Sequence, residues 1–148
     1  LGVIAGLTGG TATPKKQWDA APAKQLLDGH NRFELLDESV LQQLARDTGP
    51  EILPELIKLY SQDARARVER IAEAAASRDF KTLQYEAHTL GSSAGAHGNL
   101  RLQAIARNIE ACCRENNETK ALEHAALITE IATASLGSLA ERSTRGFV

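Results

Sequence analysis

One histidine in a stretch rich in glycine and serine is the most chemically suggestive feature of the chain. The stretch reads HTLGSSAGAHG over residues 88–98, inside a segment whose apolar residues follow a helical period. Glycine inside a helix costs about 1 kcal/mol relative to alanine, so Gly91 and Gly95 need a reason. Small residues let two helices pack closely, but they also clear the approach to His88 for a partner. Spacing alone leaves both explanations open.

His88 lies one residue off the apolar stripe of its helix, so we expect an imidazole that is partly exposed to solvent. Residues three and four apart are neighbours on a helix, and they define the surface that a partner would meet. This predicted docking face consists of Gln84, Tyr85, Gly91, Ser92 and Gly95.

Other chemistries of histidine fit the spacing poorly. His88 and His97 are nine residues apart, which places them on opposite faces of one helix, so we predict no metal site. Ser92 is near His88, but the N–H groups of a helix interior are already bonded and form no oxyanion hole. No glycine-rich loop joins a strand to a helix, as a nucleotide site would need. The remaining possibility is that His88 accepts a phosphoryl group, and that a partner supplies the metal ion and the cationic side chains for the transfer.

The elements that must position His88 are helices. From residue 36 onward the apolar residues recur at steps of three and four, and no strand pattern competes. We predict a short helix capped by Asp37 or Ser39 and ended by Gly49, then four long helices. These long helices begin at Pro50 or Glu51, after Asp79, near Asn99 and near Glu118, the last running to about Glu141. The prediction is an all-α, up-and-down antiparallel four-helix bundle with the short N-terminal helix as a lid.

Length and composition restrict the class of protein. The chain has 148 residues, a formal charge of −2, 4% aromatic residues and two adjacent cysteines, Cys112 and Cys113. We expect one domain over residues 36–142, with residues 1–35 as a linker or tail and 143–148 as a C-terminal tail. The charge argues against nucleic-acid binding. No apolar run is long enough to span a membrane, which favours a cytoplasmic domain without direct membrane contact.

The segment around His88 resembles the histidine-containing phosphotransfer (HPt) domains of multistep two-component phosphorelays. The family's motif is approximately A-H-x-L-K-G-S-S, followed by a glycine ten residues and a leucine fourteen residues after the histidine. This chain has Ala87-His88-Thr89-Leu90, then Ser92-Ser93-Ala94, with Gly98 and Leu102 at those two positions. The resemblance covers about residues 36–142.

The resemblance implies that His88 is a phosphoacceptor. It would take the phosphoryl group, on Nε2, from the aspartyl phosphate of a response-regulator receiver domain and pass it to another receiver's aspartate. The domain would act as a monomer without kinase activity or a cofactor of its own, because the receiver binds the magnesium. Many family members form the C-terminal end of a membrane-anchored hybrid sensor kinase, and the resemblance implies the same place for this domain. A free-standing carrier is the alternative.

The chain departs from the family's motif close to His88. Gly91 replaces the usual lysine, Ser92 replaces the usual glycine, and His97 stands where an apolar residue is usual. Lys81, two turns upstream of His88, is the candidate replacement for the lost cation. The alternative functions are a bundle that binds receivers without phosphotransfer and a plain helical scaffold.

Overall fold

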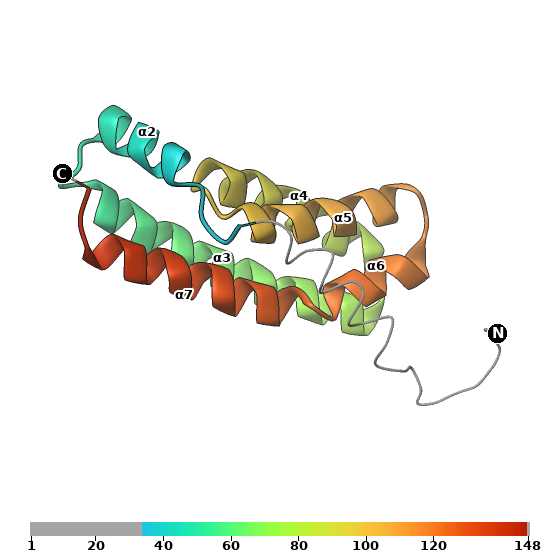
Figure 1. The fold of residues 1–148 in the computed structure, drawn as a ribbon. Coiled ribbons are helices and arrows are strands. Elements are labelled where there is room, and N and C mark those ends of the chain that lie inside the picture. The colour runs from blue at the N-terminus through green and yellow to red at the C-terminus, as the bar shows by residue number, and fades with distance from the viewer. Residues whose placement is uncertain (1–33, 148) are drawn as a thin grey trace.

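The computed structural model describes residues 34–147, and these residues form helices without a strand (Figure 1). The all-α class predicted from the sequence is confirmed. The helices in chain order are α2 (Glu38–Thr48), α3 (Leu53–Ser77), α4 (Phe80–Ala96), α5 (Leu100–Arg114), α6 (Glu118–Ala125) and α7 (Ile128–Thr144).

Most helix boundaries follow the local signals in the sequence. The Asp37 side chain accepts a hydrogen bond from the backbone N–H of Ser39 at the start of α2, and Gly49 ends that helix with a φ of 102°. Asp79 caps α4 in the same way by accepting from the N–H of Thr82. The helix predicted from Pro50 or Glu51 begins later, at Leu53, because the residues after Gly49 form a turn.

The last predicted helix is two helices. α6 ends at Ala125 and α7 begins at Ile128, where the N–H of Leu127 bonds to the carbonyl of His124, three residues back. A bond over three residues tightens the backbone and ends the α-helical ladder. Neither glycine nor proline marks this position, which explains why the apolar pattern did not predict the break.

The long helices surround one apolar core. α3 contacts α4, α4 contacts α5, α5 contacts α6 and α7, and α7 returns to contact α3. Figure 1 shows α4 beside α5 and α7 beside α3. The connections between α3, α4, α5 and α6 are only two or three residues long, which favours antiparallel neighbours. The largest buried side chains are leucine and isoleucine, in keeping with a composition poor in aromatic residues.

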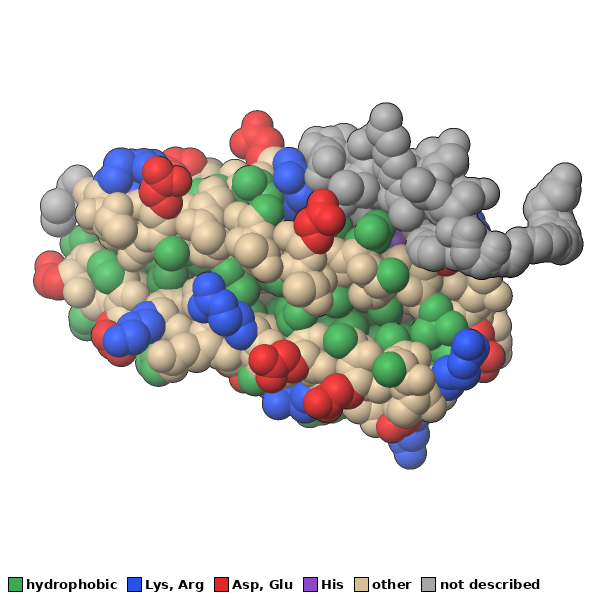
Figure 2. Space-filling model, turned by 90° about the horizontal axis from the view of Figure 1, so that it is seen from below, with side chains coloured by type: hydrophobic (Ala, Val, Ile, Leu, Met, Phe, Trp, Pro, Cys, Tyr) green, Lys and Arg blue, Asp and Glu red, His purple; other side chains and the backbone are tan. Residues whose placement is uncertain are grey.

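The face formed by α3 and α7 has an apolar furrow. Figure 2 shows hydrophobic side chains along the middle of this face and charged ones around them. The furrow's apolar lining comes from Val68 and Ala72 of α3 and from Ala132 and Leu136 of α7. The alanines at two of these positions, Ala72 and Ala132, leave room between the two helices.

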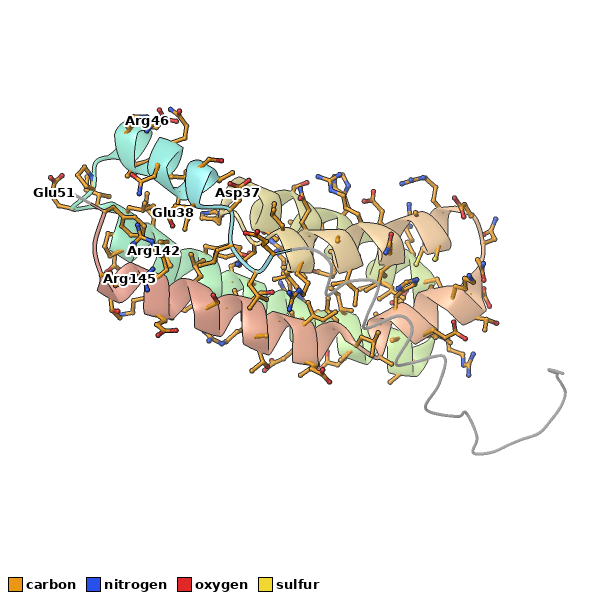
Figure 3. All side chains as sticks on the ribbon, viewed as in Figure 1. Asp37, Glu38, Arg46, Glu51, Arg142 and Arg145 are labelled. Atoms are coloured by element: carbon orange, nitrogen blue, oxygen red, sulfur yellow. The ribbon has the colours of Figure 1, made fainter. Side chains whose placement is uncertain are left out.

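α2 covers one end of the bundle, as predicted for a lid (Figure 1). Its Leu41 is fully buried, and the N–H of Asp37 donates to the carbonyl of Gly98 at 2.8 Å. Glu38 binds the Arg142 guanidinium through two hydrogen bonds of 2.9 and 2.7 Å, which join α2 to α7 (Figure 3). These contacts place the lid over the end where α4 meets α5.

The C-terminal boundary lies further along the chain than predicted. α7 continues to Thr144, and the buried ring of Phe147 lies under the Arg142 guanidinium, 4.4 Å from it. Arg142 also donates to the carbonyl of Gly146 at 2.7 Å. The residues up to Phe147 therefore pack on the domain and do not form a separate tail. The predicted linker falls mostly on residues 1–33, which lie outside the described residues.

No helix of residues 34–147 combines the length and the apolar character that crossing a membrane requires.

Candidate functional site

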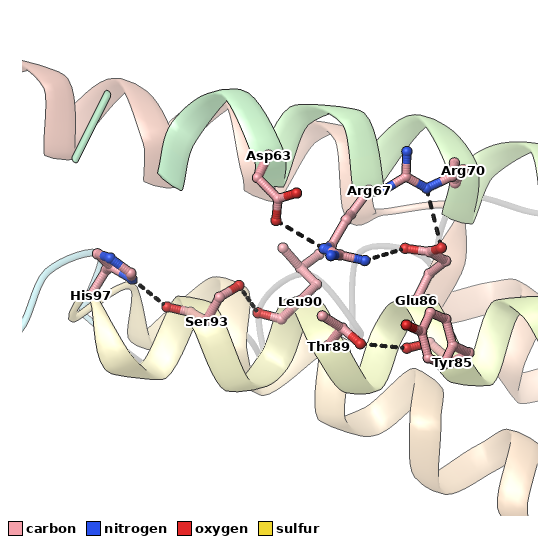
Figure 4. A network of polar contacts seen from close by, with 9 residues as sticks. All are labelled: Asp63, Arg67, Arg70, Tyr85, Glu86, Thr89, Leu90, Ser93 and His97. Carbon is pink, nitrogen blue, oxygen red and sulfur yellow. Dashed lines mark hydrogen bonds and ion pairs between the residues drawn. The ribbon is translucent and has the colours of Figure 1, made fainter. Parts of the chain in front are cut away.

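The orientation of α4 decides which of its residues face the solvent. Glu86 is buried against α3, where its carboxylate binds Arg67 at 2.9 Å and Arg70 at 3.1 Å (Figure 4). Arg67 also binds Asp63 at 2.9 Å. A buried carboxylate needs such partners, so this cluster restricts the rotation of α4 about its axis. Because Glu86 faces α3, the side chain of residue 88 lies on the opposite side of α4 and points away from α3.

His88 is the exposed side chain that results, and a carboxylate on α5 holds its ring. The side chain is 61% exposed, and its Nδ1 lies 2.8 Å from Oε2 of Glu110, which is only 16% exposed. A carboxylate accepts hydrogen bonds and donates none, so Nδ1 carries the proton. The lone pair of the neutral imidazole is then on Nε2, which makes Nε2 the nucleophilic atom.

A shallow depression of about 350 Å³ lies beside the imidazole. Its lining consists of Lys81, Gln84, Tyr85, His88 and Glu110. Tyr85 is 63% exposed, although aromatic rings are usually buried, so it offers apolar surface next to the histidine. The structure thus brings Gln84, Tyr85 and Lys81 of the sequence prediction together around His88.

The two glycines of the predicted docking face pack against α5. Gly91 is buried, and a Cβ there would lie 3.3 Å from Cγ of Arg107 and 3.5 Å from Cβ of Ala106. A Cβ at Gly95 would meet the side-chain amide of Gln103, whose Cδ lies 2.8 Å from that position. Gly91 therefore does not belong to an exposed docking face, contrary to the prediction, and Gly95 is half-buried beneath the Gln103 side chain. Both glycines let α5 approach α4 closely.

These contacts show that α4 and α5 run antiparallel through the site. Along α4 the contacting residues are His88, Gly91 and Gly95, and along α5 the corresponding residues step backwards as Glu110, Arg107 and Gln103. The small glycines therefore set the distance between the helices that lets Glu110 reach the imidazole. Ser92, the remaining member of the predicted face, is exposed, as predicted.

His97 lies at the other end of α4 in a structural role. Its ring stacks on Tyr60 with centroids 4.1 Å apart. Its Nδ1 is 2.7 Å from the carbonyl of Ser93, as Figure 4 shows. The Tyr60 hydroxyl donates to Asn99 at 2.7 Å, and burial raises the pKa of this phenol well above its usual range. No group of three or more histidine, cysteine or acidic side chains within residues 34–147 is arranged to hold a metal.

The sequence reasoning missed Glu110 and Arg114. Arg114 donates to the same Oε2 of Glu110, at 3.3 Å, so the three side chains form one chain of contacts. Glu110 is 22 residues from His88, and no local spacing connects the two. The only signal in the sequence for their contact was that His88 and Glu110 each border the apolar stripe of their own helix.

Within residues 34–147, the bundle thus presents an exposed imidazole that a carboxylate on the neighbouring helix orients. The family model described as "Hpt domain" matches residues 55–137, from α3 through most of α7. No curated protein matches the chain.

Two solved structures share the fold at low identity. The crystal structure of histidine-containing phosphotransfer protein B from Pseudomonas aeruginosa PAO1 matches with a TM-score of 0.69 and 18% identity, covering 74% of this chain and 95% of that one. A candidate histidine-containing phosphotransfer protein from rice matches with a TM-score of 0.60 and 18% identity, covering 84% and 92%.

The chain therefore belongs to the Hpt domain family. Members of this family are phosphotransfer carriers of two-component phosphorelays, and response regulators are the class of partner with which they work.

Proposed function

We propose that His88 is the phosphoacceptor, that it takes the group from one receiver domain, and that it passes the group to another. The observation that carries this assignment is the pairing of Glu110 with Nδ1, which leaves Nε2 of an exposed ring as the free nucleophile. His97 is engaged with Tyr60 and Ser93, and His124 is buried, so neither offers an equivalent atom.

The transfer needs no proton donor or acceptor beyond the site. The lone pair of Nε2 attacks the phosphorus of a receiver's aspartyl phosphate, the bond from phosphorus to the carboxylate oxygen breaks, and the aspartate leaves as a carboxylate. The ring becomes an imidazolium whose remaining N–H is bound to Glu110, so the carboxylate stabilises the charge that develops. In the second transfer, another aspartate attacks phosphorus and Nε2 leaves with its lone pair.

The surroundings of His88 provide a surface for the receiver. Gln84 and Tyr85 flank the ring on one side and exposed Ser92 on the other, and we assign the docking face to these three residues. Lys81 lines the same depression and is a candidate cation for the phosphoryl group. The magnesium for the reaction would be bound by the receiver, and the domain would act as a cytoplasmic monomer.

Glu110 is a positioning residue in this proposal. Glu110→Gln keeps a hydrogen-bond acceptor for Nδ1 but removes the charge, and charge-assisted bonds are roughly twice as strong as neutral ones. We expect transfer to slow by about tenfold with an unchanged thermal midpoint. A purely structural role would instead change the thermal midpoint and leave the rate per folded molecule intact.

The deciding experiment uses a panel of purified receiver domains charged with radiolabelled acetyl phosphate. Wild-type protein should gain a label that is stable to base and labile to acid, and peptide mapping should locate it on His88. His88→Gln should lose the label and keep its circular dichroism spectrum and thermal midpoint. A label on another histidine would refute the assignment. Receiver binding without any label would favour the alternative, a receiver-binding module.

A further inference from the structure

The site lacks the lysine that the family's motif carries three residues after the histidine, and the structure shows why a lysine does not fit there. Gly91 occupies that position and is buried beneath Cγ of Arg107. A side chain at residue 91 would have to displace Arg107 before it could reach the imidazole. A cation that binds the phosphoryl group would therefore come from another position.

We propose that Arg114 of α5 is this cation and that it binds the phosphoryl group on Nε2 of His88. The inference rests on the proposed function. Its structural basis is the pair of hydrogen bonds that meet on Oε2 of Glu110, 2.8 Å from Nδ1 of His88 and 3.3 Å from Nη1 of Arg114. Because both bonds end on the same oxygen, the guanidinium lies within about 6 Å of the imidazole.

Arg114 has the donors and the freedom that this role requires. A guanidinium carries five N–H donors, and the contact with Glu110 uses one terminal nitrogen. Its side chain is 60% exposed, so rotation about its stem meets little resistance from packing. Planar guanidinium groups bind the oxygens of a phosphoryl group through two parallel hydrogen bonds.

The charges of the site also favour a cation beside Glu110. A phosphoryl group on Nε2 adds about two negative charges close to the Glu110 carboxylate. Arg114 already faces that carboxylate and offsets the repulsion between the two anions. Two other cations are near. Lys81 lines the depression, and Cγ of Arg107 lies over Gly91.

The test measures the phosphohistidine directly and without a receiver. The full chain is phosphorylated with phosphoramidate, whose P–N bond breaks as ammonia leaves and the Nε2–P bond forms. Phosphorus NMR then follows the pH titration of the phosphoryl group on His88. A cation in contact with the group favours its dianion, so Arg114→Gln should raise the titration midpoint by about half a pH unit. Arg114→Lys should restore most of this difference.

Matched controls separate Arg114 from its neighbours. Arg107→Gln should leave the titration midpoint of the phosphoryl group unchanged. The Arg107 side chain covers Gly91 and does not line the depression beside His88. Lys81→Gln should shift the midpoint by less than Arg114→Gln, because no contact joins Lys81 to the Glu110 carboxylate that Arg114 and His88 share. An unchanged midpoint in Arg114→Gln, or a larger shift in Lys81→Gln, would overturn the inference.

A double-variant cycle separates direct contact from an effect through Glu110. In the Glu110→Gln background, Arg114→Gln should still raise the midpoint if the guanidinium touches the phosphoryl group. A shift that disappears in that background would mean that Arg114 acts only on the carboxylate, and the proposed contact would be refuted. If wild-type His88 takes no phosphoryl group, the proposed function fails and this inference fails with it. A normally labelled wild type with unresponsive Arg114 variants overturns only the inference.

Discussion

Bulk at Gly91 should destabilise the domain, because this glycine is buried against Arg107 and Ala106 of α5. Helix propensity alone predicts the opposite, since a good helix former would gain about 1 kcal/mol over glycine. Gly91→Leu must add three carbon atoms beyond a Cβ that already lies 3.3 Å from Arg107, 3.5 Å from Ala106 and 3.9 Å from the backbone nitrogen of residue 107. Overpacking of this kind typically costs about 1–3 kcal/mol.

The net effect of Gly91→Leu should be a loss of up to about 2 kcal/mol in the free energy of unfolding. Gly91→Ala should be close to neutral, because the stem of Arg107 can yield by a few tenths of an ångström and the propensity gain offsets the strain. Gly137 in α7 is the matched control, since a Cβ there would meet nothing within 4 Å. Gly137→Ala should therefore show the propensity gain alone.

Urea denaturation followed by circular dichroism measures all three variants on one scale. A difference of 1 kcal/mol corresponds to a shift of about 4 °C in the thermal midpoint of a domain this size, which thermal unfolding resolves. The reasoning would be refuted if Gly91→Leu were as stable as Gly137→Ala. That result would mean that α4 and α5 separate without cost at this point.

Two other predictions concern the lid and the turn between α4 and α5. The Arg142 hydrogen bonds hold the pKa of Glu38 at about 2, below its usual 4.5, so this pair stabilises the fold above pH 4.5 and its contribution is lost as the pH falls toward 2. Glu38→Gln should lower the free energy of unfolding at pH 7 by about 1 kcal/mol or less, since the carboxylate is half exposed. The difference from wild type in urea melts should shrink as the pH falls from 4.5 and disappear below about pH 2. Asn99 is fully buried, accepts from Tyr60 and donates to the carbonyls of Leu35 and Ser135, so Asn99→Ala should cost at least about 2 kcal/mol. Tyr60→Phe removes one of these bonds and should cost about half as much, and equal losses in the two variants would contradict this account of the cluster.

Local signals in the sequence determined the helices and the identity of the candidate nucleophile. The steps of three and four between apolar residues, the caps at Asp37 and Asp79 and the stop at Gly49 are properties of short segments, and they depend on contacts within one or two turns. The exposure of His88 followed from the same periodicity, because it lies one residue off the apolar stripe.

The partners of His88 were decided by the tertiary structure. Glu110 and Arg114 reach the imidazole only because α5 lies antiparallel to α4 at a distance set by Gly91, and a pairing over 22 residues leaves no periodic trace within either helix. The sequence interpretation placed Gly91 on the docking face and left close helix packing open, since periodicity shows that a helix face carries small residues and does not show which neighbour covers it. Packing between helices depends on volumes contributed by distant segments, so only the folded chain distinguishes a docking strip from a helix contact.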